Sequence, residues 1–331
     1  MPRARIFVSR DLPGDGIARL KQAGFAVDVW TQHDPPPVGV LMGAASACDG
    51  LLTMLTERAN ADLLDAAPDV RIVSNMAVGY DNIDVEACRR RGVLVTNTPG
   101  VLTETTADLA FALMLAVARR VVEGDRIVRE GGWGAWHPSF LLGRDLYGAT
   151  LGIVGLGAIG EAVARRAHGF GMGVLYTSRH RRPEAERDLG VDWRSLDDLL
   201  RESDFVSVHV ALNDETRGLI GPQELSLMKP SAFLVNTARG GIVDQAALVE
   251  ALSERRIGGA GLDVAAVEPV PPDDPLLRLD NLVITPHVGS ATVATRTKMA
   301  DLAVENLIAF FEGRRPPHCV NPEVLEGSGS G

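Results

Sequence analysis

The fold of this chain is indicated by the segment Gly155-Leu156-Gly157-Ala158-Ile159-Gly160, together with the runs on either side of it. An apolar, strand-like run at 149–154 precedes it, a helix-like run at 161–170 follows it, and a second strand-like run occupies 173–176. A G-x-G-x-x-G turn between a strand and a helix is typical of a dinucleotide-binding unit. The turn lies about halfway along the 331 residues, so we expect another folded unit before it.

Each glycine of this turn has its own physical role. Gly155 and Gly157 permit a tight turn and a close approach of the backbone to a pyrophosphate, while Gly160 lets the helix pack closely on the strand. Ala158 and Ile159 lead into the helix, whose free N–H groups and positive dipole end favour a phosphate. We therefore predict that residues 155, 157, 158, 159 and 160 bind a dinucleotide cofactor.

Strand-like and helix-like runs alternate through the rest of the chain. The strand-like runs lie at 5–9, 26–30, 50–54, 72–74, 93–96, 205–209, 233–236, 261–264 and 283–285. The helix-like runs lie at 14–22, 61–67, 85–91, 103–129, 245–256 and 291–311. Such alternation indicates parallel sheets with helices on both faces.

Composition excludes several classes of protein. The length favours roughly two domains. A formal net charge of −10 argues against a nucleic-acid partner, and the longest apolar run, 109–118, is too short to cross a membrane. The widely spaced Cys48, Cys88 and Cys319 form no C-x-x-C motif, which favours reduced thiols in a cytoplasmic protein. We predict no metal site, and we expect a flexible tail at 327–331.

The loop after the second strand of the dinucleotide unit reads Thr177-Ser178-Arg179-His180-Arg181-Arg182. Units that bind NAD usually place an acidic residue there to hold the ribose 2′-hydroxyl. Here no acid is present, and a hydroxyl with arginines would instead bind a 2′-phosphate. We therefore predict a preference for NADPH, with NADH also possible, through the residues Ser178, Arg179, His180 and Arg181. The alternative is a solvated basic loop.

Three residues of complementary chemistry follow later strand-like runs. Arg239, Glu268 and His287 lie in the segments 235–241, 263–269 and 285–290. The carboxyl ends of parallel strands share one edge of a sheet, so these residues can meet beside a bound nicotinamide. Arginine binds a carboxylate or carbonyl, histidine transfers a proton near neutral pH, and a neighbouring glutamate orients the charged histidine.

Each of the three also has an ordinary structural interpretation. His287 could cap backbone groups in its loop, and His209, at another strand end, is a rival histidine. Arg239 could form a surface ion pair, and Glu268 could belong to a solvated turn before Pro269. Their joint occurrence at three strand ends downstream of one glycine turn favours the catalytic interpretation.

Further motifs cover nearly the whole chain. They are Val78-Gly79-Tyr80-Asp81-Asn82-Ile83-Asp84, Asn97-Thr98-Pro99-Gly100-Val101-Leu102-Thr103, Thr106-Ala107-Asp108-Leu109-Ala110, and the segments 236–241, 261–269 and 285–292. With these motifs the chain resembles the D-isomer-specific 2-hydroxyacid dehydrogenase family, and most of all its glyoxylate/hydroxypyruvate reductase branch. The resemblance implies a catalytic trio of Arg239, Glu268 and His287.

The resemblance also implies the ligand contacts. The backbone at Val78 and Gly79, with Arg239 and His287, would bind the substrate. The residues implied near the cofactor, beyond the glycine turn and its basic loop, are Thr106, Thr237, Asp263 and Gly289. Two departures stand out: the segment 209–212 lacks the proline often found there, and Ala265-Ala266-Val267 replaces an acidic cluster.

The implied fold is α/β, with two doubly wound parallel-sheet domains. A Rossmann domain at 100–289 would bind NAD(P) and be inserted in a flavodoxin-like substrate domain at 1–99 and 290–326. The implied reaction reduces a small 2-keto acid, glyoxylate or hydroxypyruvate, in a cleft between the domains, and His287 donates the proton. Substrate-pocket residues are expected among Met54, Leu55, Met76, Trp136 and Phe140.

Three further expectations accompany this interpretation. The helix from Thr103 and the following arm, with Trp133, Trp136 and Phe140, resemble the family's dimerisation region, so we expect a homodimer; core packing is the alternative for these aromatics. A phosphoglycerate or phosphite dehydrogenase is the main rival enzyme. A non-enzymatic scaffold that senses a dinucleotide is the rival outside enzymes, because fold does not fix function.

Overall fold

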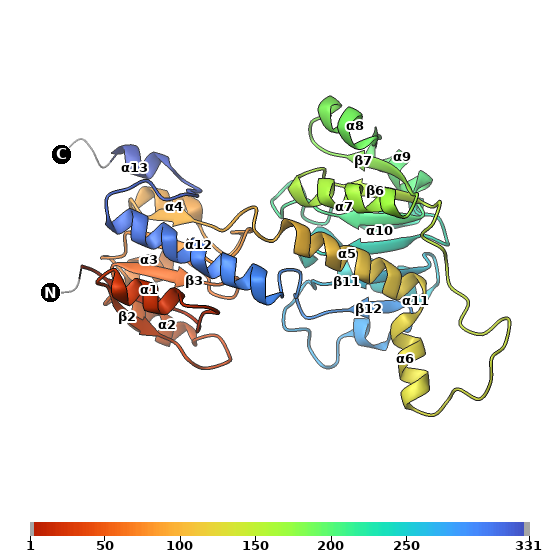
Figure 1. Cartoon of the computed structure of the whole chain (residues 1–331), viewed down its shortest axis with the longest axis horizontal. Helices are drawn as coiled ribbons and strands as arrows, with labels where there is room; N and C mark the ends of the chain where they lie inside the picture. Colours follow the sequence, from red (N-terminus) through yellow and green to blue (C-terminus); the bar gives the residue numbers. More distant parts are fainter. Residues whose placement is uncertain (1–2, 328–331) are drawn as a thin grey trace. The chain divides into compact units, whose positions relative to one another are not determined.

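The computed structural model describes residues 3–327, which form two compact units (Figure 1). The first unit ends at Leu102 and resumes at Ala291, and the second is Thr103–Ser290. The predicted boundaries, after residue 99 and before residue 290, lie within a few residues of these divisions. Of the predicted tail, Gly327 is the last residue of helix α13, and residues 328–331 lie outside the described part.

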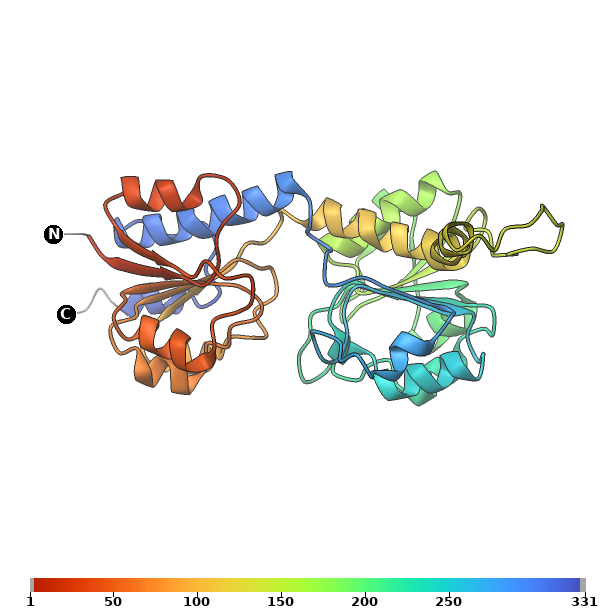
Figure 2. The ribbon, with the colours of Figure 1, turned by 90° about the horizontal axis from the view of Figure 1, so that it is seen from below.

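The first unit is built on five parallel strands in the order β2-β1-β3-β4-β5, the flavodoxin-like order. The strands are β1 (Arg5–Val8), β2 (Ala26–Val29), β3 (Gly50–Thr53), β4 (Ile72–Asn75) and β5 (Leu94–Thr96). The helices are α1 (Gly16–Gln22), α2 (Val38–Ala45), α3 (Ala61–Ala66), α4 (Val85–Arg90), α12 (Val293–Phe311) and α13. Helices α1 and α12 cover one face of the sheet, and α2, α3 and α4 cover the other (Figure 2).

Local chemistry starts and ends these elements. Side chains at Asn60, Asp84 and Thr292 accept backbone N–H groups at the starts of α3, α4 and α12. Such N-caps satisfy donors that a helix cannot pair internally. Helix α2 was not predicted, because its sequence is apolar and contains two glycines, Gly39 and Gly43, with no polar face to reveal a helical period.

The second unit is built on seven parallel strands in the order β12-β11-β10-β9-β6-β7-β8. The strands are β6 (Thr150–Val154), β7 (Gly173–Thr177), β8 (Asp192–Trp193), β9 (Phe205–Val208), β10 (Phe233–Asn236), β11 (Gly259–Leu262) and β12 (Leu282–Ile284). Six of them have the order of a Rossmann sheet, and the strand order reverses between β6 and β9. The fold class predicted from the sequence is therefore confirmed.

Helices cover both faces of this second sheet. They are α5 (Thr103–Ala118), α6 (Val121–Arg129), α7 (Ala158–Gly169), α8 (Pro183–Leu189), α9 (Leu196–Glu202), α10 (Pro222–Leu227) and α11 (Gln245–Ser253), with the 3₁₀ turns η1 (Gly240–Ile242) and η2 (Pro275–Arg278). One buried apolar cluster lies between the sheet and α5 and α7, and a second lies under α9, α10 and α11. No helix among residues 3–327 is both long and apolar enough to cross a bilayer.

The single helix predicted over 103–129 is wrong. Helix α5 ends at Ala118, and Arg120 adopts a left-handed conformation (φ 52°) before α6 begins. The chain returning from the arm ends α5: the Arg144 N–H donates to the Ala118 carbonyl over 2.9 Å, and Gly143 lies against the same carbonyl. A Cβ at Gly143 would lie 2.2 Å from that oxygen, so this close approach requires glycine.

Candidate active site

The glycine turn between β6 and α7 leaves space on one side and packs tightly on the other. Gly155 has φ of +101°, a conformation that side chains other than glycine rarely adopt. A Cβ at Gly160 would lie 2.2 Å from the Gly155 carbonyl oxygen, so the helix touches the turn directly. At Gly157, in contrast, an added Cβ would meet nothing within 4 Å. This open side is the one along which a dinucleotide can pass.

Helix α7 begins three residues earlier than predicted, at Ala158, so Ala158 and Ile159 lie in its first turn. Gly157 is its N-cap and supplies no side-chain acceptor, which leaves the first N–H groups of the helix available for a phosphate. The Thr237 hydroxyl is buried and has no hydrogen-bond partner among residues 3–327. The unpaired Thr237 hydroxyl and the uncapped N-terminus of α7 both fit a bound nicotinamide dinucleotide.

The basic loop after β7 is paired with carboxylates. Arg179 forms an ion pair with Glu215, and Arg181 forms a two-bond pair with Glu186 at 2.8 Å. The hydrogen bonds from Arg181 and Tyr176 lower the pKa of Glu186 to about 2, so this carboxyl is ionised. The Ser178 hydroxyl donates to the His180 carbonyl over 2.6 Å. The predicted 2′-phosphate residues thus lie together in one loop, with Arg179 and Arg181 engaged by acids.

Arg182 has a role that the sequence did not reveal. Its Nη1 donates to the Leu156 carbonyl over 2.6 Å and lies 2.6 Å from a carboxylate oxygen of Glu161. Leu156 belongs to the glycine turn, so this guanidinium ties the basic loop to the turn. The only signal in the sequence was its position at the end of the basic run.

Asp263 organises the loop that carries His287. This buried carboxylate, which follows β11, accepts hydrogen bonds from the Thr285 hydroxyl (2.6 Å) and from the N–H groups of Val288 (2.8 Å) and Gly289 (2.7 Å). The Thr106 hydroxyl donates to the Gly289 carbonyl over 3.2 Å. The structure thus brings together Thr106, Asp263 and Gly289, three of the predicted cofactor-binding residues.

His287 and Glu268 form a hydrogen-bonded pair. His287 Nδ1 lies 2.8 Å from Glu268 Oε2, and the other carboxylate oxygen accepts the Ala265 N–H over 3.0 Å. Burial alone would raise the pKa of Glu268, but the hydrogen bond and charge of His287, with the Ala265 N–H and the Arg239 charge, lower it. The carboxylate is therefore ionised beside the imidazole, and it leaves Nε2 as the ring nitrogen for other contacts.

The backbone at His287 is held in an unusual conformation. Its φ is 53°, in the left-handed region that non-glycine residues seldom occupy, and its N–H donates to the carbonyls of Asp263 (2.9 Å) and Thr285 (3.0 Å). Such conformations persist only where the surroundings impose them, and they concentrate at functional sites. The fixed backbone sets the direction in which the imidazole leaves the chain.

Arg239 lies three residues after the end of β10 and immediately precedes η1. Its Nη1 donates to the Ala238 carbonyl over 2.8 Å, and its own carbonyl accepts the Asn236 side-chain amide over 2.9 Å. The next residue, Gly240, packs on the Ala265 carbonyl so closely that a Cβ would lie 1.9 Å from the oxygen. This contact joins the Arg239 loop to the loop that carries Glu268.

His209, the rival histidine, does not share these features. Its Nε2 lies 2.8 Å from the Ser207 hydroxyl, and no carboxylate is among its hydrogen-bond partners in the described part. Burial lowers the pKa of His209 to about 4, which leaves the ring neutral near pH 7. A neutral imidazole is a poor proton donor, so the geometry favours His287 over His209.

The other predicted substrate residues lie in varied surroundings. Val78 and Gly79 are half-buried in the loop after β4, and Leu55 is 37% exposed. Met76 is 7% exposed and belongs to the apolar core of the first unit, which does not favour a pocket role. Trp133, Trp136 and Phe140 are exposed, at 80% for Trp136, so the core-packing alternative for these aromatics is wrong.

Comparison with known proteins identifies the family. A family model described as the D-isomer-specific 2-hydroxyacid dehydrogenase NAD-binding domain matches residues 111–289, more than half of the chain. The chain belongs to the D-isomer-specific 2-hydroxyacid dehydrogenase family. It is therefore an NAD(P)-dependent D-2-hydroxyacid dehydrogenase, and the matched residues lie in the unit with the glycine turn. No group of three or more metal-ligating side chains is found among residues 3–327.

Two sequence relatives and two solved structures show how far the similarity extends. This dehydrogenase is 54% identical over 325 residues to a glyoxylate reductase of Korarchaeum cryptofilum and 53% identical over 328 residues to one of Thermococcus kodakarensis; each match covers 98% of both chains. A Thermus thermophilus structure is 49% identical, with a TM-score of 0.90 and coverage of 96% and 99%. An NADPH-dependent glyoxylate/hydroxypyruvate reductase of Sinorhizobium meliloti, solved with NADP and malonate, is 36% identical, with a TM-score of 0.85 and coverage of 96% and 97%.

Proposed function

We propose that this dehydrogenase reduces small 2-keto acids, glyoxylate and hydroxypyruvate, to D-2-hydroxy acids and prefers NADPH. The observation that carries the proposal is the 2.8 Å contact between His287 and Glu268, formed at strand ends of the same sheet as Arg239. The names of relatives at 54% and 53% identity support glyoxylate as substrate, and the Sinorhizobium meliloti enzyme supports hydroxypyruvate and NADPH.

The three polar side chains have separate roles in this proposal. Arg239 binds the substrate carboxylate and polarises the keto oxygen, together with the backbone at Val78 and Gly79. His287 donates a proton from Nε2 to the developing alkoxide, because Nδ1 is engaged by Glu268. The ionised Glu268 favours the protonated imidazole and fixes its orientation.

The cofactor site is proposed from the second unit. The first turn of α7, with Gly155, Gly157 and Gly160, would hold the pyrophosphate, and Thr106, Thr237, Asp263 and Gly289 would lie near the nicotinamide. When bound, the reduced nicotinamide supplies the hydride for the keto carbon. Ser178 and Arg179 would receive the 2′-phosphate. In NADPH binding, Arg179 would exchange the Glu215 carboxylate for the phosphate.

A kinetic panel tests this function. Glyoxylate, hydroxypyruvate, pyruvate, 3-phosphohydroxypyruvate and phosphite are each assayed, the keto acids with NADPH and NADH and phosphite with the oxidised cofactors. We expect the highest kcat/KM with glyoxylate or hydroxypyruvate and NADPH. Preferential turnover of the phosphorylated substrate or of phosphite would assign another branch of the family. Tight NADPH binding without turnover of any of these compounds would favour the scaffold function.

Two variants test the assignment of residues. His287→Ala should lower kcat by about 10²–10⁴-fold, because it removes the proton donor. Arg179→Asp should raise the KM for NADPH and spare that for NADH, because it replaces a cation beside the 2′-phosphate with an anion. A His287→Ala variant with near-wild-type kcat would contradict the proton-donor role. An unchanged NADPH affinity in Arg179→Asp would contradict the cofactor preference.

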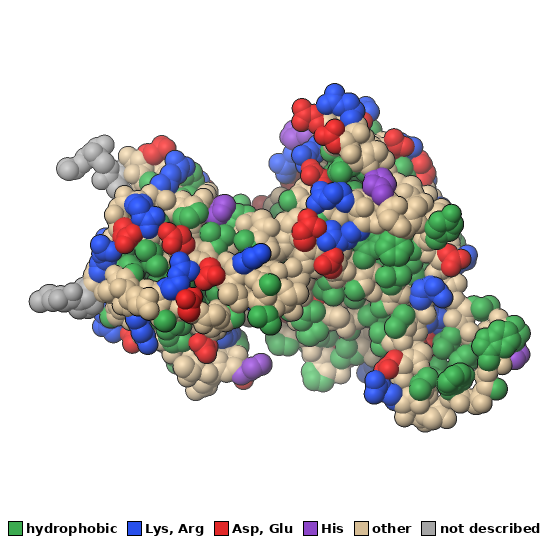
Figure 3. Space-filling model, in the orientation of Figure 1, with side chains coloured by type: hydrophobic (Ala, Val, Ile, Leu, Met, Phe, Trp, Pro, Cys, Tyr) green, Lys and Arg blue, Asp and Glu red, His purple; other side chains and the backbone are tan. Residues whose placement is uncertain are grey.

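We further propose that the enzyme is a homodimer formed through α6 and the arm that follows it. Residues 131–140 are all exposed, and α6 buries none of its side chains. Figure 3 shows apolar side chains gathered on this arm. The arm includes Trp133, Trp136 and Phe140, which are 58%, 80% and 44% exposed, and such a group of exposed apolar side chains is typical of an interaction surface. A hollow of about 550 Å³ beside α6, lined in part by Val122 and Leu142, offers a second copy a place to pack. A monomeric mass in solution would contradict the dimer.

A cytoplasmic location is also proposed, and the free thiols of Cys48, Cys88 and Cys319 support it.

A further inference from the structure

Three successive backbone carbonyls in the loop after β4 are each held by a donor. The Ala77 carbonyl accepts the Thr98 N–H over 2.8 Å. The Val78 carbonyl accepts the side-chain amide of Asn97 over 2.8 Å, and the Gly79 carbonyl accepts the side-chain amide of Asn75 over 3.0 Å. Two of these three donors are thus asparagine side chains, which come from different strand ends of the first unit.

The held carbonyls determine where the neighbouring N–H groups point. A trans peptide is planar, and its C=O and N–H point in opposite directions. The N–H groups of Val78, Gly79 and Tyr80 therefore face away from Thr98, Asn97 and Asn75. None of these three N–H groups has an acceptor among residues 3–327. Successive unpaired N–H groups in a loop form a concave site for an anion.

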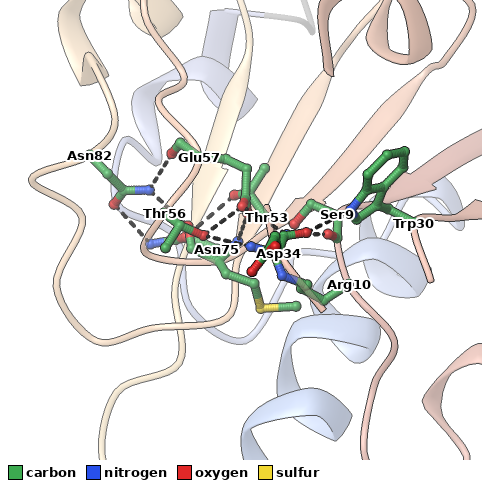
Figure 4. Close-up of polar contacts among 10 residues, drawn as sticks. Ser9, Arg10, Trp30, Asp34, Thr53, Thr56, Glu57, Asn75 and Asn82 are labelled. Atoms are coloured by element: carbon green, nitrogen blue, oxygen red, sulfur yellow. Dashed lines mark hydrogen bonds and ion pairs between the residues drawn. The ribbon is translucent and has the colours of Figure 1, made fainter. Parts of the chain in front are cut away.

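Asn75 is itself fixed by a polar network that includes Asn82 and Glu57 (Figure 4). Asn75 is fully buried; its Oδ1 accepts the Thr53 hydroxyl (3.3 Å), and its Nδ2 also lies 3.4 Å from Asn82 Oδ1. Asn82 donates to the carbonyls of Met54 (3.0 Å) and Glu57 (2.8 Å). The buried Glu57 carboxylate accepts the Met54 N–H over 2.7 Å, so this network cannot rotate freely.

We propose that Asn97 and Asn75 are positioning residues that aim the N–H groups of Val78, Gly79 and Tyr80 at the substrate carboxylate. The inference rests on the proposed function. It adds the N–H of Tyr80 as a third donor, and it assigns Asn97 and Asn75 to orient the peptide planes that carry the N–H groups of Gly79 and Tyr80. The ligand class is a small carboxylate, which accepts several N–H bonds at once. Preorganised donors bind an anion better than donors that must reorient on binding.

The test uses the full-length enzyme with bound cofactor and two readouts. Oxamate carries a carboxylate but no reducible ketone, so its dissociation constant from the enzyme–cofactor complex reports binding alone. In Asn97→Ala we expect this constant, and the KM for glyoxylate, to rise by roughly three- to tenfold, the equivalent of one orienting hydrogen bond. The dissociation constant of NADPH should not change. Asn75→Ser, a second variant at the next peptide plane, should act in the same direction.

Asn321→Ala is the matched control. Asn321 is buried in the same unit and also holds main-chain atoms, the N–H of Val95 (2.7 Å) and the carbonyl of Val93 (3.0 Å), at the edge strand β5. It should lower the melting temperature and leave the oxamate constant unchanged. Wild-type oxamate affinity and KM in Asn97→Ala, or a change no larger than in Asn321→Ala, would overturn the inference. A wild type that binds oxamate in an Asn97-dependent manner but reduces no 2-keto acid would instead overturn the proposed function.

Discussion

Glu268 and His287 lie 19 positions apart in the chain, yet Glu268 Oε2 is 2.8 Å from His287 Nδ1. The two residues follow different strands, β11 and β12, whose carboxyl ends share one edge of the sheet. The pKa of Glu268 is lowered in this arrangement, so the ionised Glu268 stabilises the folded state at pH values above its ordinary pKa of 4.5. That contribution is lost as the pH falls through the lowered folded-state pKa.

Glu268→Gln should narrow the pH range of keto-acid reduction from the alkaline side. Glutamine keeps the size of the side chain but carries no charge, so it no longer favours a protonated imidazole. We expect kcat at neutral pH to fall by about tenfold or more, and the alkaline limb of the pH–rate profile to move to lower pH. Glu250→Gln, at an exposed glutamate paired with Arg256, is the control. An unmoved alkaline limb would contradict the role of the charge.

Gly240→Ala should separate the Arg239 loop from the loop that carries Glu268. The new Cβ would lie 1.9 Å from the Ala265 carbonyl oxygen, and this backbone atom cannot move without shifting Glu268. We expect the free energy of unfolding to fall by about 1–3 kcal/mol and kcat to fall with it. The neighbouring Gly241→Ala is a matched control, because its Cβ would lie 3.4 Å from Leu212, an ordinary contact. Equal melting temperatures and kcat values for the two variants would disprove the packing role.

Asp263→Asn should disorder the loop that carries His287, although asparagine keeps the size of the aspartate side chain. The NH2 group of asparagine cannot accept hydrogen bonds as the carboxylate oxygen it replaces does, so at least one donor among Thr285, Val288 and Gly289 loses its partner. A buried donor left unpaired costs about 1–3 kcal/mol of stability. Denaturant unfolding measures this loss, and steady-state kinetics should show a lower kcat. Wild-type values in both measurements would show that the carboxylate is dispensable.

Arg182→Ala and Arg179→Asp should affect cofactor binding in different ways. Arg182 contacts the Leu156 carbonyl in the glycine turn, which both cofactors would share, so its loss should weaken NADH and NADPH binding by similar factors of roughly threefold to tenfold. Arg179→Asp should weaken NADPH binding alone. Dissociation constants of each cofactor, measured by fluorescence, distinguish the two patterns. A selective loss of NADPH affinity in Arg182→Ala would place this residue at the 2′-phosphate instead.

Local sequence patterns were sufficient for the glycine turn, for the order of the strand-end residues and for the strands of residues 3–327 other than the two-residue β8. A parallel strand is a short apolar run. Within the turn, the positive φ of Gly155 and the close contact of Gly160 with the Gly155 carbonyl each require glycine, whereas the structure leaves open space at Gly157. The break at Arg120 was not predictable, because the run over 103–129 contains no proline and its one interior glycine, Gly124, lies beyond the break. The Ala118 carbonyl is satisfied by Arg144, a residue of the returning arm.

The α/β class, the dinucleotide turn and the residue types at the strand ends all follow from local patterns in the sequence. The folded chain was needed to establish that His287 pairs with Glu268 while His209 pairs with Ser207, and that Arg182 supports the glycine turn. It also decided that Asn75 and Asn97 hold the carbonyls of Gly79 and Val78. Three of these contacts, His287–Glu268, Arg182–Leu156 and Asn97–Val78, join residues 19 or more positions apart, and the folded backbone, not local propensity, brings such residues within hydrogen-bonding distance. The other two, His209–Ser207 and Asn75–Gly79, lie within four positions, and the path of the backbone after the strand sets their geometry.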